Sequence, residues 1–231
     1  MRSSSVAAAL VLALGTNNLL ASTIYDLNFT PPEFGSYTIY SGNPYVAPSI
    51  GPFTDALVFR ATNSIPGISD QIRLPLGNVG QGVIVSFDVM AHSLRGSKYR
   101  FSMFLDTPEV RSVSLNGLSN NAQAFQPFAP INLFEFADDQ VYHFEISVDL
   151  ATALWSVSVD GHKWFTRDFA ASTLQSIRFS TDKASGVAVP NAETYAALDN
   201  ILVTTIPEPN TLAFLGLGSL VFMMRSRRRA G

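Results

Sequence analysis

Strict alternation of apolar and polar residues dominates the middle of this chain. In the segment GVIVSFDVMA the apolar residues from Val83 to Val89 occupy every second position, and VYHFEISVDL repeats the pattern from Tyr142 to Val148. A period of two is that of a β-strand with one buried face. No convincing run of ten or more residues in the body has the helical period. The pattern predicts an all-β body of roughly a dozen antiparallel strands, arranged as a two-sheet sandwich.

The most specific part of this pattern runs from Tyr142 to Phe165. One strand ends at Asp149, a second carries Trp155, and the pair Asp160-Gly161 separates it from a third. An Asp-Gly pair accepts the positive φ angles that a tight hairpin requires. The segment resembles the central hairpin of laminin-G-like and concanavalin-A-like jelly rolls, and the matching positions are Tyr142, His143, Asp149, Trp155, Asp160 and Gly161. That resemblance implies a jelly roll in which the segments IYDLNF and AALDNILVTT, at the two ends of the body, pair as neighbouring strands.

Two apolar segments flank the body. Residues 1–22 combine Arg2, an apolar run and the small residues Ala21 and Ser22, which is the layout of a secretory signal peptide. The uncharged run at 211–224 predicts a transmembrane helix of about 21 Å, which is short for a permanent anchor. We therefore expect an exported sandwich domain at 23–205, between a signal peptide and a separate carboxyl-terminal segment at 206–231.

The carboxyl-terminal segment has three parts in a fixed order. Pro207, Glu208 and Pro209 come first, the apolar run follows, and the segment closes with Arg225, Arg227, Arg228 and Arg229. Proline pushes the preceding residue into an extended conformation, which is the form in which most proteases and transpeptidases bind their substrates. The arginines are expected to stay on the cytoplasmic side and so to stop membrane transfer.

These three parts resemble the PEP-CTERM sorting signal of Gram-negative bacteria. The resemblance implies export by the Sec machinery and recognition by an exosortase, an integral-membrane, transpeptidase-like cysteine enzyme. The chain would be anchored transiently in the inner membrane and would then reach the cell surface or the exopolysaccharide matrix. Such a signal specifies how a protein is sorted, while the ligand of its body is a separate question.

Charge and cysteine content exclude several classes of function. The body from Thr23 to Thr205 contains 10 Lys and Arg residues against 17 Asp and Glu residues. This acidic balance argues against a nucleic-acid partner, because duplex DNA requires a basic face. The absence of cysteine excludes disulfides, cysteine-ligated zinc and thiol catalysis.

No catalytic residues are expected. Glycoside hydrolysis needs two carboxyl groups that face one sugar. Glu145 and Asp149 share a strand face, but they are about 13 Å apart, and the Glu-x-Asp-x-Glu pattern of jelly-roll glucanases is absent. His92, His143 and His162 are isolated in the sequence and indicate neither nucleophilic catalysis nor a zinc site. We therefore expect a non-enzymatic protein, with a glycan-active hydrolase that has an atypical site as the alternative.

Two kinds of binding site stay open. Sandwich modules often hold structural calcium through loop carboxylates and carbonyl groups, and the candidate ligands are Asp26, Asp199 and Asn200, with Asp138-Asp139 as a pair that a solvated turn explains better. No cofactor is required. Glycan binding would use exposed aromatic rings, and the candidates are Trp164, Tyr40, Tyr45 and Phe128. Binding of carbohydrate or another matrix component rests on the resemblance in fold. A purely structural surface protein is the other alternative.

Overall fold

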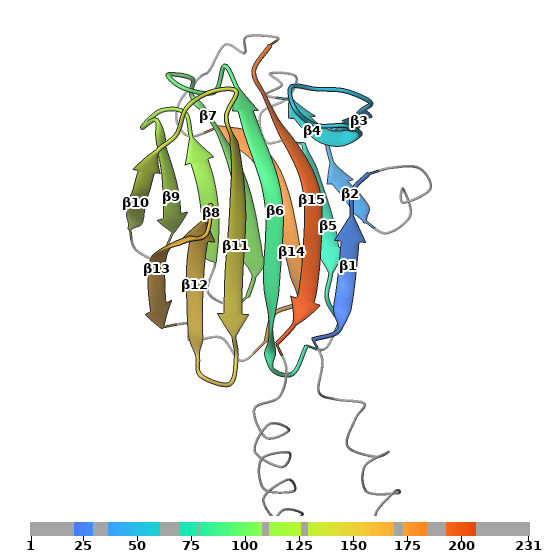
Figure 1. Ribbon diagram of the computed structural model, residues 1–231, viewed down its shortest axis with the longest axis vertical. Helices are drawn as coiled ribbons and strands as arrows, with labels where there is room; N and C mark the ends of the chain where they lie inside the picture. Colours follow the sequence, from blue (N-terminus) through green and yellow to red (C-terminus); the bar gives the residue numbers. More distant parts are fainter. Residues whose placement is uncertain are drawn as a thin grey trace, which may run out of the picture.

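The described part of the chain forms two antiparallel β-sheets packed face to face (Figure 1). The structure is a computed structural model, and it describes residues 21–29, 37–60, 70–77, 79–107, 111–125, 129–168, 173–183 and 193–206. Within these ranges there are fifteen strands, and no helix is long and apolar enough to cross a membrane. The predicted all-β sandwich is confirmed. The predicted Pro-Glu-Pro motif, apolar helix and arginine cluster lie outside the described residues, as does the predicted signal peptide except for its last two residues.

The strands divide into an eight-stranded sheet A and a seven-stranded sheet B. In sheet A the order is β13 (His162–Asp168), β12 (Leu154–Val159), β11 (Val141–Asp149), β6 (Gly82–His92), β15 (Tyr195–Thr205), β4 (Ala56–Arg60) and β3 (Tyr45–Ala47), and β1 (Thr23–Leu27) also pairs with β15. In sheet B the order is β10 (Pro130–Glu135), β9 (Asn121–Phe125), β8 (Arg111–Asn116), β7 (Tyr99–Asp106), β14 (Ser176–Lys183), β5 (Gln71–Pro75) and β2 (Thr38–Ser41).

The core lies between the two sheets and contains the apolar side of the alternation. Every second residue from Val83 to Val89 in β6 and from Tyr99 to Leu105 in β7 is buried. Aromatic rings connect the layers: the ring of Phe179 in sheet B meets that of Phe87 in sheet A edge-on, with centroids 5.1 Å apart. Full burial of such a side chain contributes about 1.5–3 kcal/mol. The predicted inward positions are therefore confirmed.

The hairpin predicted at Asp160-Gly161 is present between β12 and β13, where the φ angles are 51° and 76°. Asp160 also fixes the start of β11, because its carboxylate accepts the backbone N–H of His143 at 2.9 Å and its own N–H donates to the His143 carbonyl at 2.9 Å. At the far end of β11, the Asp149 carboxylate accepts the backbone N–H groups of Ala151 and Thr152. An aspartate thus organises the turn at each end of this strand.

The two ends of the sandwich meet at one pole of the molecule. β1 runs antiparallel to β15 with Thr23 opposite Thr204, so the predicted pairing of the end segments is confirmed. The Thr205 N–H donates to the Ser22 carbonyl, and the Ser22 N–H donates to Oγ1 of Thr205, both at 2.9 Å. We call this end the terminal pole. The β6–β7, β8–β9 and β10–β11 connections lie at the opposite end, the loop pole, at the top of Figure 1.

Candidate functional site

A row of polar side chains crosses the outer face of sheet B. The strand register brings one residue from each of six neighbouring strands into this row: Gln71, Ser180, Ser102, Ser114, Gln123 and Asn132. In β7, Ser102 stands between Phe101 and Met103, which point into the core. Because successive side chains of a strand point to opposite faces, the serine points outward. We call these six residues the polar row.

Side-chain amides at one end of the polar row hold one another in place. The Asn116 amide donates to the Gln123 carbonyl oxygen at 2.9 Å, and the Gln123 amide donates to the Asn132 carbonyl oxygen at 2.8 Å. Each planar amide has two N–H donors and one acceptor oxygen. The chain of amides therefore presents donors and acceptors in fixed directions.

Two hydroxyl groups in the middle of the polar row have unmet hydrogen-bonding capacity. Ser102 and Ser114 lie directly opposite each other on β7 and β8, and they are only 1% and 3% exposed. Neither Oγ atom has a hydrogen-bond partner among the described residues. An unsatisfied buried hydroxyl costs about 1–3 kcal/mol. Both Oγ atoms are also closed to solvent, so a ligand would gain bonds here only by displacing the groups that cover them.

Ion pairs line both sides of the polar row. Toward the loop pole, Arg100 donates to both carboxylate oxygens of Asp182, at 2.9 and 2.8 Å. Toward the terminal pole, Asp106 accepts from Nε of Arg178 at 2.5 Å and from the Ser176 hydroxyl. Arg73 joins the second group, because its Nε lies 3.5 Å from the Asp106 carboxylate. These contacts place three guanidinium groups and two carboxylates beside the row, in a body that is acidic as a whole.

Two half-buried aromatic rings complete the face. Phe104 of β7 and Phe125 of β9 align with Ser112 of β8, one step from the polar row toward the terminal pole. The Arg178 guanidinium carbon lies 5.0 Å from the centroid of the Phe104 ring, and that of Arg100 lies 5.2 Å from the Phe125 centroid. Cation–π contacts of this kind hold rings and guanidinium groups in fixed orientations. The outer face of sheet B thus combines hydroxyls, amides, guanidinium groups and ring faces.

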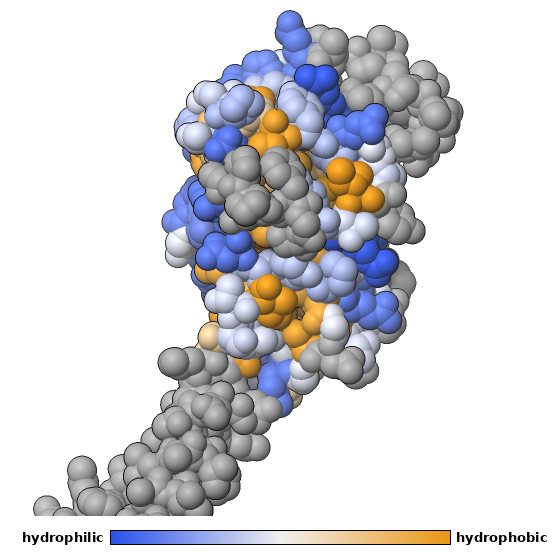
Figure 2. All heavy atoms as spheres, turned by 90° about the vertical axis from the view of Figure 1, so that its right-hand side faces the viewer, coloured by the Kyte–Doolittle hydropathy of each residue, from blue (hydrophilic) through white to orange (hydrophobic). Residues whose placement is uncertain are grey.

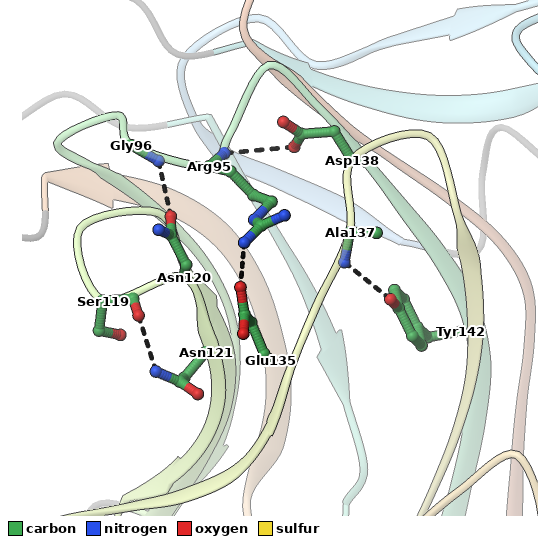
Figure 3. Close-up of polar contacts among 9 residues, drawn as sticks. All are labelled: Arg95, Gly96, Ser119, Asn120, Asn121, Glu135, Ala137, Asp138 and Tyr142. Carbon is green, nitrogen blue, oxygen red and sulfur yellow. Dashed lines mark hydrogen bonds and ion pairs between the residues drawn. The ribbon is translucent and has the colours of Figure 1, made fainter.

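The loop pole is braced by hydrogen bonds between three connections (Figure 3). The Asp138 carboxylate accepts the N–H groups of Leu94 and Arg95 at 2.9 and 3.2 Å, and the Asn120 side chain accepts the Gly96 N–H at 2.7 Å. Arg95 also forms an ion pair with Glu135. Asp138 therefore caps a loop, as expected for a carboxylate with a structural role in a turn.

The predicted calcium ligands are not gathered into one group. Asp26 lies on β1 opposite Leu202, whereas Asn200 lies in an irregularity of β15 and donates to the Asp88 carboxylate at 2.8 Å. Asp199 is buried and accepts the Asn200 N–H at 2.8 Å. The ranges that the structure describes contain no cluster of three or more His, Cys, Asp or Glu side chains that could hold a metal ion. Calcium binding stays a prediction.

Two described histidines pair with separate carboxylates. His92 Nδ1 lies 2.6 Å from Asp139, and His143 Nδ1 lies 2.6 Å from Asp88. The His92 ring also stacks on Tyr195. Burial raises the pKa of Tyr195, and the charges of Asp139 and Tyr45 raise it further.

The predicted aromatic candidates lie at different edges of the sandwich. Trp164 is on edge strand β13, at an irregularity of the register where it has no partner residue on β12. The residue is 41% exposed, and its ring packs on Phe134 with centroids 5.4 Å apart. Tyr45 is on β3 at the opposite edge of sheet A, where its hydroxyl accepts from Arg60 at 2.9 Å. Figure 2 shows the side that carries β1 to β4, where hydrophobic residues form small, separate patches.

The side chains of two further aromatic candidates are not described. Tyr40 belongs to β2 of sheet B, but its side chain is not among those described, and Phe128 lies outside the described residues. The polar row was missed by sequence reasoning. Its only signal is the polar half of the alternation in segments such as YRFSMFLD and RSVSLN, which gives no information on the register between strands.

A known sorting signal matches the carboxyl-terminal segment of the chain. Residues 205–229 match the family described as the PEP-CTERM protein-sorting motif. The chain carries a PEP-CTERM sorting motif. This motif indicates export, processing by an exosortase at the membrane and delivery to the surface. It covers a small part of the chain, and no curated protein matches the sequence.

Solved structures similar to this chain are jelly-roll and lectin-like β-sandwich domains. The Crh5 transglycosylase in complex with NAG has a TM-score of 0.60 and 15% identity, and the match covers 83% of this chain and 87% of that one. The botulinum neurotoxin serotype D binding domain has a TM-score of 0.57 and 11% identity, with 84% and 52% covered. A sialidase has a TM-score of 0.56 and 17% identity, with 80% and 18% covered.

These likenesses establish the fold alone, because the identities are low. The chain spans about half of the neurotoxin domain and 18% of the sialidase. What those proteins bind or cleave is therefore a property of those proteins, and the function of this sandwich has to be argued from its own residues.

Proposed function

We propose that this protein is an exported, non-enzymatic surface or matrix protein whose sandwich binds a glycan on the outer face of sheet B. The sorting motif supports the destination. The observation that carries the binding role is the pair of buried, unpartnered hydroxyls of Ser102 and Ser114 at the centre of the polar row. The predicted Gram-negative host is part of the same proposal.

The chemistry of the face suits a sugar ring. A sugar presents alternating donors and acceptors at its hydroxyl groups and an apolar C–H surface on its ring faces. The amides of Gln123 and Asn132 and the hydroxyls of Ser102 and Ser114 would form hydrogen bonds with the sugar hydroxyls. The rings of Phe104 and Phe125 would pack against the C–H surface of the sugar ring. Pre-positioned groups lower the ordering cost of binding.

The charge on the face favours an acidic glycan. Arg73, Arg100 and Arg178 outnumber the two carboxylates with which they pair, Asp106 and Asp182. One guanidinium charge is thus left over beside the polar row. We therefore expect a uronic-acid polysaccharide to bind more tightly than a neutral one at low salt, with the difference shrinking as salt screens the charges.

The position of the carboxylates supports a non-enzymatic role. Asp106 lies opposite Ser176, and Asp182 lies six residues further along β14. Six residues of a strand correspond to about 20 Å. An inverting glycosidase needs carboxyl groups about 6.5–9.5 Å apart, and a retaining one needs them closer. Each aspartate is also engaged by an arginine.

Affinity electrophoresis tests the binding role. The purified protein is run through gels that contain polygalacturonate, dextran or no polysaccharide. We expect polygalacturonate to retard the wild-type protein, and Ser102→Leu, which fills the middle of the polar row, to abolish the retardation. Ser156→Leu is the matched control, because Ser156 is a half-buried serine of β12 in the other sheet. Equal migration of the wild type in all gels, or retardation of a folded Ser102→Leu variant, would show that this face does not bind glycan.

A further inference from the structure

The last strand of the sandwich remains hydrogen-bonded up to the residue before the Pro-Glu-Pro sequence of the sorting motif. Thr205 is paired with Val83 of β6, and its N–H donates to the Ser22 carbonyl at 2.9 Å. Ile206 then donates its N–H to the Gly82 carbonyl at 3.1 Å. The next residue in the sequence is Pro207, the first of the motif.

Proline has no N–H group and cannot donate to a further rung of the ladder. The point at which the sheet must end and the point at which the motif begins are therefore the same peptide bond. No linker separates the folded domain from the Pro-Glu-Pro sequence.

The partners of Thr205 and Ile206 are themselves firmly held. Gly82 has a φ of 125°, and a Cβ atom at this position would lie 2.0 Å from the Val148 carbonyl oxygen. The adjacent Gln81 accepts the N–H of Leu150 at 2.8 Å. The start of β6 thus lies between the end of β15 and the β11–β12 turn and is hydrogen-bonded to both. The backbone of this part of the terminal pole therefore has little room to move when another protein binds.

A processing enzyme that binds its substrate in an extended form needs free backbone groups on the substrate strand, because main-chain hydrogen bonds provide much of the affinity. We propose that the processing enzyme meets the terminal pole beside Gly82 and the β11–β12 turn, and draws Thr205 and Ile206 out of sheet A before it cleaves. The folded sandwich thereby slows its own processing. This inference rests on the role of the sorting motif and adds the surface that the enzyme meets.

The rate of tail removal tests the proposal. The full chain is expressed in a cell that carries the exosortase, and the mass of its carboxyl terminus is followed by pulse-chase. A flexible Gly-Ser linker of about six residues between Ile206 and Pro207 separates the motif from the sheet. We expect the linker to accelerate processing roughly tenfold, because opening two backbone hydrogen bonds lowers the population of the competent form by about that factor.

A pair of point variants removes one contact without changing the length of the chain. Ile206→Pro deletes the N–H that donates to the Gly82 carbonyl, and we expect processing to become about two- to fivefold faster. Ile206→Val keeps this N–H and should process at the wild-type rate. Limited proteolysis of each full chain verifies that the sandwich remains folded.

The outcomes distinguish this proposal from the sorting role. Faster processing of the linker and Ile206→Pro chains supports release of the last strand before cleavage. Equal or slower processing of a folded linker chain overturns it. If no chain loses its tail, the wild type included, the sorting role is wrong and release of the strand before cleavage is overturned with it.

Discussion

Ser102 and Ser114 face each other across β7 and β8 as two buried hydroxyls without a partner in the described part of the chain. Most buried polar groups in proteins are hydrogen-bonded, so an adjacent unpaired couple is uncommon. The neighbouring amides of Asn116 and Gln123 bond to other side chains instead. The sheet therefore carries a local defect in stability at the place where we propose that the ligand binds.

Replacing both serines with alanine should stabilise the unliganded protein. Ser102→Ala/Ser114→Ala removes two unsatisfied hydroxyls, and we expect a gain of about 1–2 kcal/mol, or about 2–8 °C in the midpoint of thermal unfolding. Glycan binding should weaken in the same variant. Ser112→Ala, a buried serine on the same face of β8, is the control and should give no gain. A double variant less stable than the wild type would show that the hydroxyls do contribute in the free protein.

Asp106 should be the more important of the two carboxylates beside the polar row. It is shared by Arg73, Arg178 and Ser176 and its side chain is 17% exposed, whereas the Asp182 side chain pairs with Arg100 and is 31% exposed. We expect Asp106→Ala to cost about 2 kcal/mol and Asp182→Ala about 1 kcal/mol. Denaturant unfolding measures both. A double-mutant cycle with Arg178→Ala should show coupling, and additive effects would contradict a shared network.

Trp164 should contribute to packing rather than to glycan binding on sheet B. Its ring contacts Phe134 of β10 in sheet B and His162 of its own strand β13. Trp164→Ala should lower stability by about 1–2 kcal/mol, because the ring is only partly buried, and should leave retardation in polygalacturonate gels unchanged. Tyr45→Ala, at the opposite edge, provides the comparison. Loss of retardation in a folded Trp164→Ala protein would move the binding site to this edge.

The turn after β11 should weaken in acid through Asp149. Partial burial raises the pKa of this carboxyl, but hydrogen bonds from the Thr152 side chain and from the backbone of Thr152 and Ala151 outweigh that effect, so its pKa lies below the ordinary value. A depressed carboxyl pKa stabilises the fold fully above the unfolded-state value near pH 4, and the contribution is lost as the pH falls through the folded-state value.

Asp149→Asn keeps the acceptor oxygen and removes the titration. We expect the free-energy advantage of the wild type over this variant to be constant from pH 7 to about pH 5 and to shrink below about pH 4. Denaturant unfolding across this range measures it, and Asp168→Asn on β13 serves as the charge-matched comparison. An advantage that persists unchanged at pH 2.5 would exclude Asp149 as the group responsible.

Sequence reasoning succeeded where a local pattern determines the structure. The inward positions of β6, β7 and β11 follow from apolar alternation, because shifting a strand by one residue would expose its whole apolar set. The turn at Asp160-Gly161 follows from the φ angles that these residues tolerate. The pairing of β1 with β15 was predicted from the resemblance in fold and is confirmed by the register of Asp26 and Leu202.

The candidate site could not be predicted in the same way. Ser102 and Ser180 become neighbours only through the register of β7 and β14, which depends on how the entire sheet assembles. In the sequence, a serine that faces bulk solvent and one that is buried between larger side chains occupy the same polar position of the alternation. Trp164 and Tyr45 likewise look equivalent as aromatic residues among polar ones, yet they lie at opposite edges of sheet A.

The central position of β15 also has a consequence for the order of folding. This strand pairs with β6, β4 and β1. These three strands are synthesised before β15 and lack this pairing partner until β15 has been synthesised. Pairings that are distant in the sequence form slowly, because a long loop must close before contacts compensate for the lost entropy. Sheet A therefore cannot be completed until synthesis has passed Thr205, and the growing polypeptide remains without its finished core until then.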